Sequence, residues 1–207
     1  MTLITPKGYT NIDAIEAYLL IDIAQYFEEQ VNEWIAQVEK YIENVTNRTS
    51  FIADASATAR YYDGDNTREL FIDDAVEITE ISLGTDDNAT VYTSAELRED
   101  YTLYPANALT DKKPYNSIKL TSGIFPRGDQ NIKITAKWGY SVAVPADIKL
   151  VATMLVADII EESMSAEGEV QSMSIGRYSV TYKTEERWQG IKEVKDMIAN
   201  YRSYKNF

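Results

Sequence analysis

The stretch KWGYSVAVPADIKLVATMLVADII, residues 137–160, decides the fold. It begins as the end of an alternating, strand-like run and turns at Gly139. After Pro145 it continues as a helix whose apolar residues extend around most of the circumference. A surface helix of a globular domain needs only one apolar stripe. The rest of this helix must therefore be covered by other parts of the chain or by another molecule.

Two interpretations of this helix stay open at the level of sequence. Met154 and Ile160 widen the apolar face beyond one stripe. The helix can be the central core helix of one chain, it can be partly covered by a neighbouring subunit, or both can hold on different faces. The preceding aromatic residues, Trp138 and Tyr140, also have two interpretations. They can cover the core of one chain, or they can contact another subunit, since aromatic side chains are enriched at interface hot spots.

The first fifty residues predict two helices. Residues 10–13 resemble a capping box with Thr10 as the cap, and a break is expected near residues 20–22. Apolar residues then recur every three or four positions to about Asn47, which predicts one long amphipathic helix. Glutamates are placed on its opposite side, at Glu28, Glu29, Glu33, Glu39 and Glu43.

From Phe51 to Tyr140 the apolar period falls to two and turn residues arrive regularly, which predicts an antiparallel β unit. In its last strand, alternate residues from Ile132 to Trp138 face one way. The strand candidates are ARYYDG, RELFID, AVEITEISL, ATVYTS, DYTLYP, NSIKLTS and QNIKITAKWGY.

Residues 169–183, EVQSMSIGRYSVTYK, alternate like an extended arm or hairpin around Gly176. A last helix is expected from near Thr184, followed by a short basic and aromatic tail, YRSYKNF, residues 201–207. The fold class predicted is therefore α+β. Helices of residues 1–50 and 141–207 form one body with an extended arm or hairpin, and residues 51–140 form an inserted antiparallel β domain.

Composition excludes several classes of function. The chain has 207 residues, a formal net charge of −13, no cysteine and no histidine. Without these two residue types, thiolate nucleophiles, zinc–sulfur sites and the common histidine-based triads are excluded. The acidic balance argues against gripping nucleic acid through its phosphates. No window reads as a signal peptide or a membrane span, so we expect no membrane partner.

The order of these features resembles the head–tail connector, or adaptor, proteins of tailed bacteriophages. Two motifs carry the resemblance: Trp138-Gly139-Tyr140 before the proline-led helix, and the segment IGRYSVTY, residues 175–182, before the last helix. The resemblance implies a non-enzymatic virion protein that forms a ring, twelve-fold in the family, without a cofactor or a metal. Such rings join the portal to head-closure or tail-terminator proteins and let double-stranded DNA pass without adhering. The location implied is the virion neck, with the host cytoplasm during assembly.

The resemblance also suggests roles for individual residues. The residues expected to bind the portal are Tyr201, Arg202, Tyr204, Lys205 and Phe207. Those expected at a subunit interface are Trp138, Tyr140, Met154, Ile160, Ile175, Tyr178 and Tyr182. Those expected to line the channel, where carboxylates repel the DNA backbone, are Glu28, Glu29, Glu33 and Glu39. The simpler alternatives are core packing for the aromatics, a frayed end for the tail and a solvated surface for the glutamates.

Two other functions compete with the adaptor. A virion adhesin or decoration protein would use the β domain to contact a ligand and would expose an aromatic groove there. A carboxylate-dependent hydrolase would need two close acids in a pocket. The segment Asp63-Gly64-Asp65-Asn66 lacks the ligand spacing of an EF-hand and is interpreted as a turn.

Overall fold

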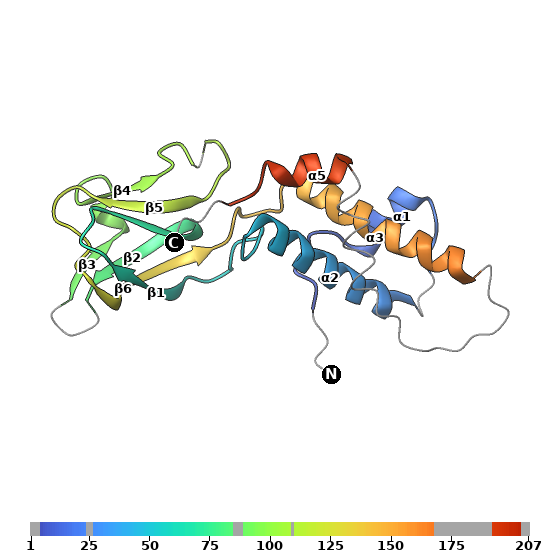
Figure 1. Ribbon diagram of the computed structural model, residues 1–207, viewed down its shortest axis with the longest axis horizontal. Coiled ribbons are helices and arrows are strands. Elements are labelled where there is room, and N and C mark those ends of the chain that lie inside the picture. The colour runs from blue at the N-terminus through green and yellow to red at the C-terminus, as the bar shows by residue number, and fades with distance from the viewer. Residues whose placement is uncertain (1–4, 24–26, 85–88, 109, 168–191, 204–207) are drawn as a thin grey trace. The chain divides into compact units, whose positions relative to one another are not determined.

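The computed structural model describes residues 5–23, 27–84, 89–108, 110–167 and 192–203. These residues fall into two compact units (Figure 1). One unit combines Met1–Arg48 with Val144–Phe207, and the other is Thr49–Ala143. The chain therefore leaves the first unit, builds the second, and returns.

The first unit is helical and is organised around α3, which lies against the other three described helices (Figure 1). Its elements are α1 (Ile12–Leu19), α2 (Glu28–Thr46), α3 (Ala146–Glu167) and α5 (Lys192–Ala199). The break expected after the first helix occurs at Leu20, which adopts a left-handed conformation, and Asn47 ends α2 in the same way.

The surroundings of α3 explain why its apolar residues extend around most of its circumference. Every residue from Val151 to Ile160 is buried or half-buried, and exposed residues lie only near the two ends, for example Lys149 and Glu161. Burying a large apolar side chain stabilises the fold by about 1.5–3 kcal/mol. A helix surrounded by three others can bury such side chains on several sides, and α3 is therefore the central core helix of this unit.

The start of α1 differs by one residue from the sequence prediction. Asn11, not Thr10, is the N-cap, and its side-chain oxygen accepts a hydrogen bond from the Ala14 N–H at 2.9 Å. Thr10 is buried instead, and its hydroxyl shares a hydrogen bond of 2.7 Å with the hydroxyl of Thr153 on α3. The predicted cap was wrong because Thr10 satisfies a buried hydroxyl on a distant helix.

The second unit is a six-stranded antiparallel sheet with the order β1-β6-β2-β5-β4, and β3 pairs with β2. Its strands are β1 (Thr58–Gly64), β2 (Glu69–Leu83), β3 (Thr90–Thr93), β4 (Tyr101–Tyr104), β5 (Tyr115–Leu120) and β6 (Gly128–Trp138). The predicted alternation of β6 is confirmed, because Ile132, Ile134, Ala136 and Trp138 are all buried.

Strand β2 is longer than the sequence suggests. The segments RELFID and AVEITEISL form one strand, in which the register shifts between Phe71 and Ala75 and again beyond Ala75. The first half of β2 pairs with β5 and the second half with β6. Such irregularities bend a strand, so β2 contributes side chains to the core, including Leu70, Ile78 and Ile81, from both of its halves.

The predicted fold class, α+β with an antiparallel sheet, is confirmed. Within the part of the chain that the structure describes, no helix combines the length and the apolarity needed to cross a bilayer.

Candidate assembly surfaces

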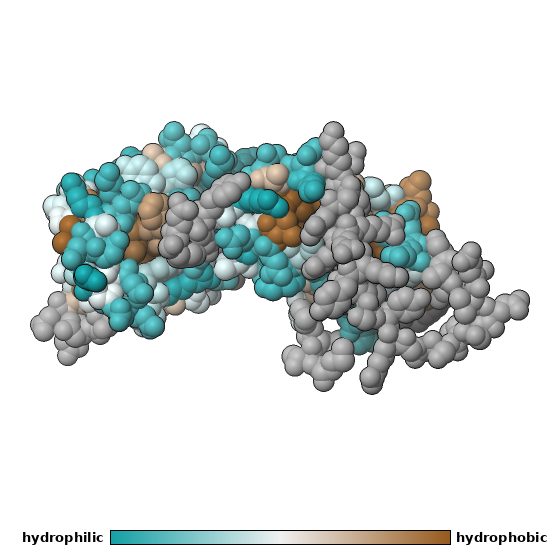
Figure 2. All heavy atoms as spheres, viewed as in Figure 1, coloured by the Kyte–Doolittle hydropathy of each residue, from teal (hydrophilic) through white to brown (hydrophobic). Residues whose placement is uncertain are grey.

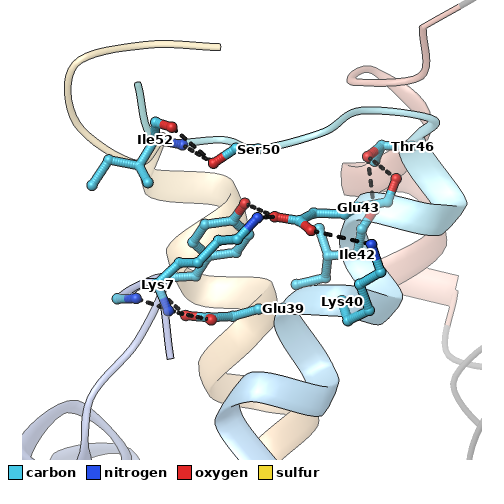
Figure 3. A network of polar contacts seen from close by, with 10 residues as sticks. Lys7, Glu39, Lys40, Ile42, Glu43, Thr46, Ser50 and Ile52 are labelled. Carbon is cyan, nitrogen blue, oxygen red and sulfur yellow. Dashed lines mark hydrogen bonds and ion pairs between the residues drawn. The ribbon is translucent and has the colours of Figure 1, made fainter. Parts of the chain in front are cut away.

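A cluster of polar contacts in the helical unit joins the N-terminal segment to α2 (Figure 3). Glu39 accepts hydrogen bonds from three consecutive backbone N–H groups: Lys7 at 2.6 Å, Gly8 at 2.8 Å and Tyr9 at 2.7 Å. One turn further along the helix, Glu43 accepts from the Tyr9 hydroxyl at 2.5 Å and from Lys7 Nζ at 2.6 Å. We call this group of five residues the N-terminal clamp.

The clamp depends on an unusual backbone conformation. Gly8 has a φ of 93°, which lets the N–H groups of residues 7–9 converge on one carboxylate. Charge-assisted hydrogen bonds of this kind are about twice as strong as neutral ones. Tyr9 is fully buried. The clamp therefore holds the buried Tyr9 side chain against α2 in the core of the helical unit.

The clamp corrects one of the residues proposed for the channel. Glu39 is only 2% exposed and its carboxylate is occupied by backbone N–H groups, so it cannot face a channel. Glu43, predicted on the same polar side, is equally buried. Glu28 and Glu29 are exposed and Glu33 is half-buried, so these three remain available to a channel wall.

The residues proposed for a subunit interface are also largely internal. Trp138 is 1% exposed, and Tyr140 and Ile160 are buried. Within one chain these three side chains pack in the core and leave little surface for a neighbour, so their role at a subunit interface stays a prediction. Met154 is half-buried and stays a proposal. Ile175, Tyr178 and Tyr182 lie outside the described residues.

The Trp138 side chain has its own set of contacts in the sheet unit. Its indole N–H donates to the Thr58 carbonyl at 2.8 Å, and the Arg60 guanidinium lies 4.5 Å from the ring centroid. Arg60 also pairs with Asp73 at 2.7 Å, and the Tyr62 hydroxyl donates to the same carboxylate. Burial raises the pKa of Tyr62 well above its ordinary value. The cluster holds the aromatic end of β6 in place.

The start of the tail is anchored within the helical unit. The Tyr201 carbonyl accepts from Arg48 Nε at 2.6 Å, and the Ser203 N–H donates to the Thr46 carbonyl at 2.8 Å. Arg202, between them, is exposed. Of the residues proposed to bind the portal, Tyr204, Lys205 and Phe207 lie outside the described residues.

Sequence reasoning missed an aromatic row on the sheet. Phe71 of β2 and Tyr104 of β4 are both paired in register with Ser117 of β5, so the three side chains share one face. Phe71 is 64% exposed and Tyr104 38%, while Ser117 between them is buried. Elsewhere, hydrophobic residues form separate small patches on the visible face of the sheet unit (Figure 2). The in-register pairing could not be derived before the strands were aligned.

Of the predicted acidic turn, Asp63 and Gly64 are the last residues of β1, and Asp65 and Asn66 lie in the connection to β2. Asp63 accepts a hydrogen bond from the Gln130 N–H at 2.6 Å, and Asp65 accepts from the Thr67 N–H at 3.2 Å. Asp63 thus binds backbone at the start of β6, and Asp65 binds backbone of the turn itself. Among the described residues, no group of three or more acidic, histidine or cysteine side chains could hold a metal ion.

Comparison with protein families finds no matching family, and comparison with curated protein sequences finds no match. Solved structures that are similar include two chains from gene transfer agent particles. A chain described as the neck of an empty gene transfer agent particle, computed with C6 symmetry, aligns with a TM-score of 0.53 and 13% identity over 100% of this chain and 96% of that one. A chain of the virion of a native gene transfer agent particle aligns with a TM-score of 0.45 and 14% identity, with the same coverage. This chain therefore shares its fold, across its whole length, with a chain from the neck of a phage-like particle.

Proposed function

We propose that this protein is a non-enzymatic structural component of the neck of a phage-like virion. The observation that carries the proposal is the fold shared over the whole chain with a chain from a gene transfer agent neck. The order of motifs, from Trp138-Gly139-Tyr140 to residues 175–182, supports it independently, because it resembles the connector family.

In this proposal the protein is an adaptor that forms a ring beneath the portal and joins it to a head-closure or tail-terminator protein. The neck of the similar particle was computed with C6 symmetry. A twelve-membered ring, as the family resemblance implies, contains a sixfold axis and is compatible with that symmetry. The location follows: the virion neck, after assembly in the host cytoplasm.

Double-stranded DNA would pass through the middle of the ring. A net charge of −13 suits a passage that does not adhere, since carboxylates repel phosphates. Glu28 and Glu29, exposed in the first turn of α2, and the half-buried Glu33 are the proposed contributors to the channel wall.

The tail is the proposed contact with the portal, through Tyr201, Arg202, Tyr204, Lys205 and Phe207. Truncation after Asn200 should weaken binding to portal particles at least tenfold, roughly the effect of losing one interface hot spot. Co-sedimentation of purified truncated and full-length protein with portal particles measures this. Unchanged binding of the truncated protein would remove the tail from the portal contact.

A second candidate function is favoured by the aromatic row. Exposed Phe71 and Tyr104 are the kind of surface that a virion adhesin or decoration protein would use to contact a ligand. If the neck proposal holds, the double variant Phe71→Ser/Tyr104→Ser should bind portal particles as well as the parent protein does.

The same double variant separates the two functions. An adhesin would lose binding to host cells or to capsids, measured with fluorescently labelled protein. Tyr61→Ser is the matched control, because Tyr61 is similarly exposed but lies on β1, at the opposite edge of the sheet from β4. Loss of cell or capsid binding in the double variant but not in the control would favour the adhesin over the adaptor.

A further inference from the structure

Strand β1 forms one end of the strand order (Figure 1). Among the strands that the structure describes, β1 has a neighbour on one side only, which is β6. From Thr58 to Tyr62 the two strands pair residue by residue without a bulge. A free sheet edge carries backbone N–H and C=O groups that can pair with a further strand. We call the outward side of residues 58–62 the β1 edge.

The backbone of β6 shows which groups face which neighbour. Successive residues of a central antiparallel strand direct their N–H and C=O groups alternately to the strands on either side. The Gly139 N–H donates to the Asp74 carbonyl at 2.8 Å, on the β2 side. The Asn131 carbonyl accepts from the Gly84 N–H at 2.8 Å, on the same side. Odd-numbered residues from 131 to 139 therefore face β2, and even-numbered ones face β1.

The register then gives the direction of each residue of β1. The even-numbered residues of β6 pair with Thr58, Arg60 and Tyr62, so these three residues face β6. The N–H and C=O groups of Ala59 and Tyr61, between them, point away from the sheet. Both residues are exposed. The β1 edge therefore offers two donors and two acceptors, in register, to an extended chain.

The other edges of the sheet are closed by the chain itself. Strand β4 ends at Pro105, which has no N–H, and the Tyr101 carbonyl accepts from the Arg98 N–H at 2.6 Å. In β3 the Thr93 N–H donates to Glu96 Oε2 at 2.7 Å, and the Thr93 carbonyl accepts from the Tyr101 hydroxyl at 3.0 Å. Hydrogen bonds within the chain thus occupy β3 and β4 where β1 is open.

Arg60 determines what kind of strand fits the β1 edge. Its guanidinium lies on the core-facing side of β1, 4.5 Å from the Trp138 ring centroid and 2.7 Å from an oxygen of Asp73. An inward charge on an edge strand discourages unspecific pairing. A guanidinium has five N–H donors, so it can bind a second carboxylate beside that of Asp73.

A second copy of this chain fits the edge poorly. The antiparallel register that uses both outward residues of each copy places Ala59 opposite Tyr61 and Arg60 opposite the same residue of the other copy. Like charges directly opposite each other destabilise strand pairing. A strand with a carboxylate at that position is favoured instead, and such a strand must come from a different protein.

We propose that the β1 edge binds an extended segment of a different protein, which joins the sheet as an antiparallel strand with an acidic residue opposite Arg60. The residues of the segment opposite Ala59 and Tyr61 lie on the other face of the sheet, beside exposed side chains, where β-branched residues fit best. The proposal does not depend on the proposed function. Tyr61→Ser keeps the backbone groups of Tyr61 and leaves the edge able to pair.

Ala59→Pro tests the β1 edge directly. Proline removes the outward N–H of residue 59 without removing a bond to β6, and proline is tolerated on edge strands for this reason. Ala59→Val is the matched control, because it keeps that N–H. Thermal unfolding followed by circular dichroism, together with the amide spectrum of β6, establishes that both variants are folded.

The probe is the synthetic peptide acetyl-Lys-Thr-Val-Glu-Val-Thr-Lys-amide, titrated into isotope-labelled protein and followed by nuclear magnetic resonance. We expect the amide signals of Ala59 and Tyr61 to shift with a Kd below about 1 mM. Ala59→Pro should bind about tenfold more weakly than Ala59→Val, because a peptide carbonyl loses its donor. Equal affinity of these two variants, or no shift in the parent at about 5 mM peptide, would overturn the proposal.

Two further measurements test the partner chemistry. A peptide with Lys in place of Glu should bind at least about fivefold more weakly, since it brings a like charge to Arg60. Equal affinity of the two peptides would overturn the assigned role of Arg60. Sedimentation velocity of the free protein covers the other occupant: a dimer that Ala59→Pro abolishes would make a second copy the partner and contradict the proposal. None of these measurements uses portal particles, so their failure leaves the neck proposal standing.

Discussion

Gly139→Ala should destabilise the sheet unit by about 3 kcal/mol, the sum of a strained backbone and an overpacked contact. Gly139 has a φ of 139°, a conformation that residues with a Cβ rarely adopt. A Cβ there would lie 2.5 Å from the Ile52 carbonyl oxygen and 2.6 Å from Ala53 Cα. Backbone atoms cannot move aside as a flexible side chain can.

The surroundings of Gly139 make this cost unavoidable. Its N–H donates to the Asp74 carbonyl at 2.8 Å, and the Ala53 N–H donates to the Ser141 carbonyl at 2.9 Å. Relieving the clash would break these bonds. Gly123→Ala is the matched control, because Gly123 also has a positive φ, 79°, but a Cβ at that position would meet no atom within 4 Å.

Urea unfolding of the two variants, followed by hydrogen exchange of the β6 amides, measures the difference. The amides report the sheet unit alone, which matters because the chain has two units that need not unfold together. Equal losses of stability in Gly139→Ala and Gly123→Ala would mean that the close approach to Ile52 and Ala53 does not exist.

Glu39→Ala should destabilise the helical unit by about 3 kcal/mol, since each buried donor left without an acceptor costs about 1–3 kcal/mol. The substitution removes the acceptor of three backbone N–H groups, of which that of Tyr9 is buried. The N-terminal segment should detach from α2, although Lys7 and Tyr9 would still reach Glu43.

Two matched variants complete this test. Gln37→Ala changes an exposed residue of the same helix and should alter stability by less than about 0.5 kcal/mol. Glu39→Gln keeps the size of the side chain but replaces one accepting oxygen by a donor, so it should fall between the two. Hydrogen exchange at the Gly8 and Tyr9 amides is the direct readout. Protection of these amides in Glu39→Ala equal to that in Gln37→Ala would contradict the clamp.

Local patterns in the sequence predicted most of the architecture. Helical periodicity placed the end of α2 to within a residue of Thr46, and alternation identified the buried side of β6. The α+β class and the antiparallel sheet were predicted from two positions, near Phe51 and Tyr140, where the spacing of apolar residues changes between helical and alternating. These features depend on neighbours within a few residues, and such patterns are what a sequence displays directly.

The N-terminal clamp was not predicted, because it joins residues that are distant in the chain. A glutamate on a helix is normally assigned to the solvated side. Glu39 and Glu43 do, however, follow Ile35 at steps of four and are flanked by Val38 and Ile42, all buried. Their position beside the apolar stripe was the available signal, and only the folded position of residues 7–9 shows what satisfies them.

The aromatic row and the anchoring of Tyr201 and Ser203 at the end of α2 were missed for a related reason. Phe71, Ser117 and Tyr104 align only through the register of three strands, two of which are short. The anchoring joins the end of a helix to a segment that lies far from it in the sequence. Sequence reasoning placed the tail at a partner, but it contained no sign that Arg48 would hold it.

The neck proposal is tested most directly by imaging portal particles of the same virus after mixing them with this purified protein. Electron cryomicroscopy with particle averaging should show an added ring on the portal, coaxial with its channel, with the tail segment at the portal contact. Portal alone, and portal mixed with the protein truncated after Asn200, are the controls. Portal particles that carry no added density at saturating concentrations of the full-length protein would contradict the adaptor assignment.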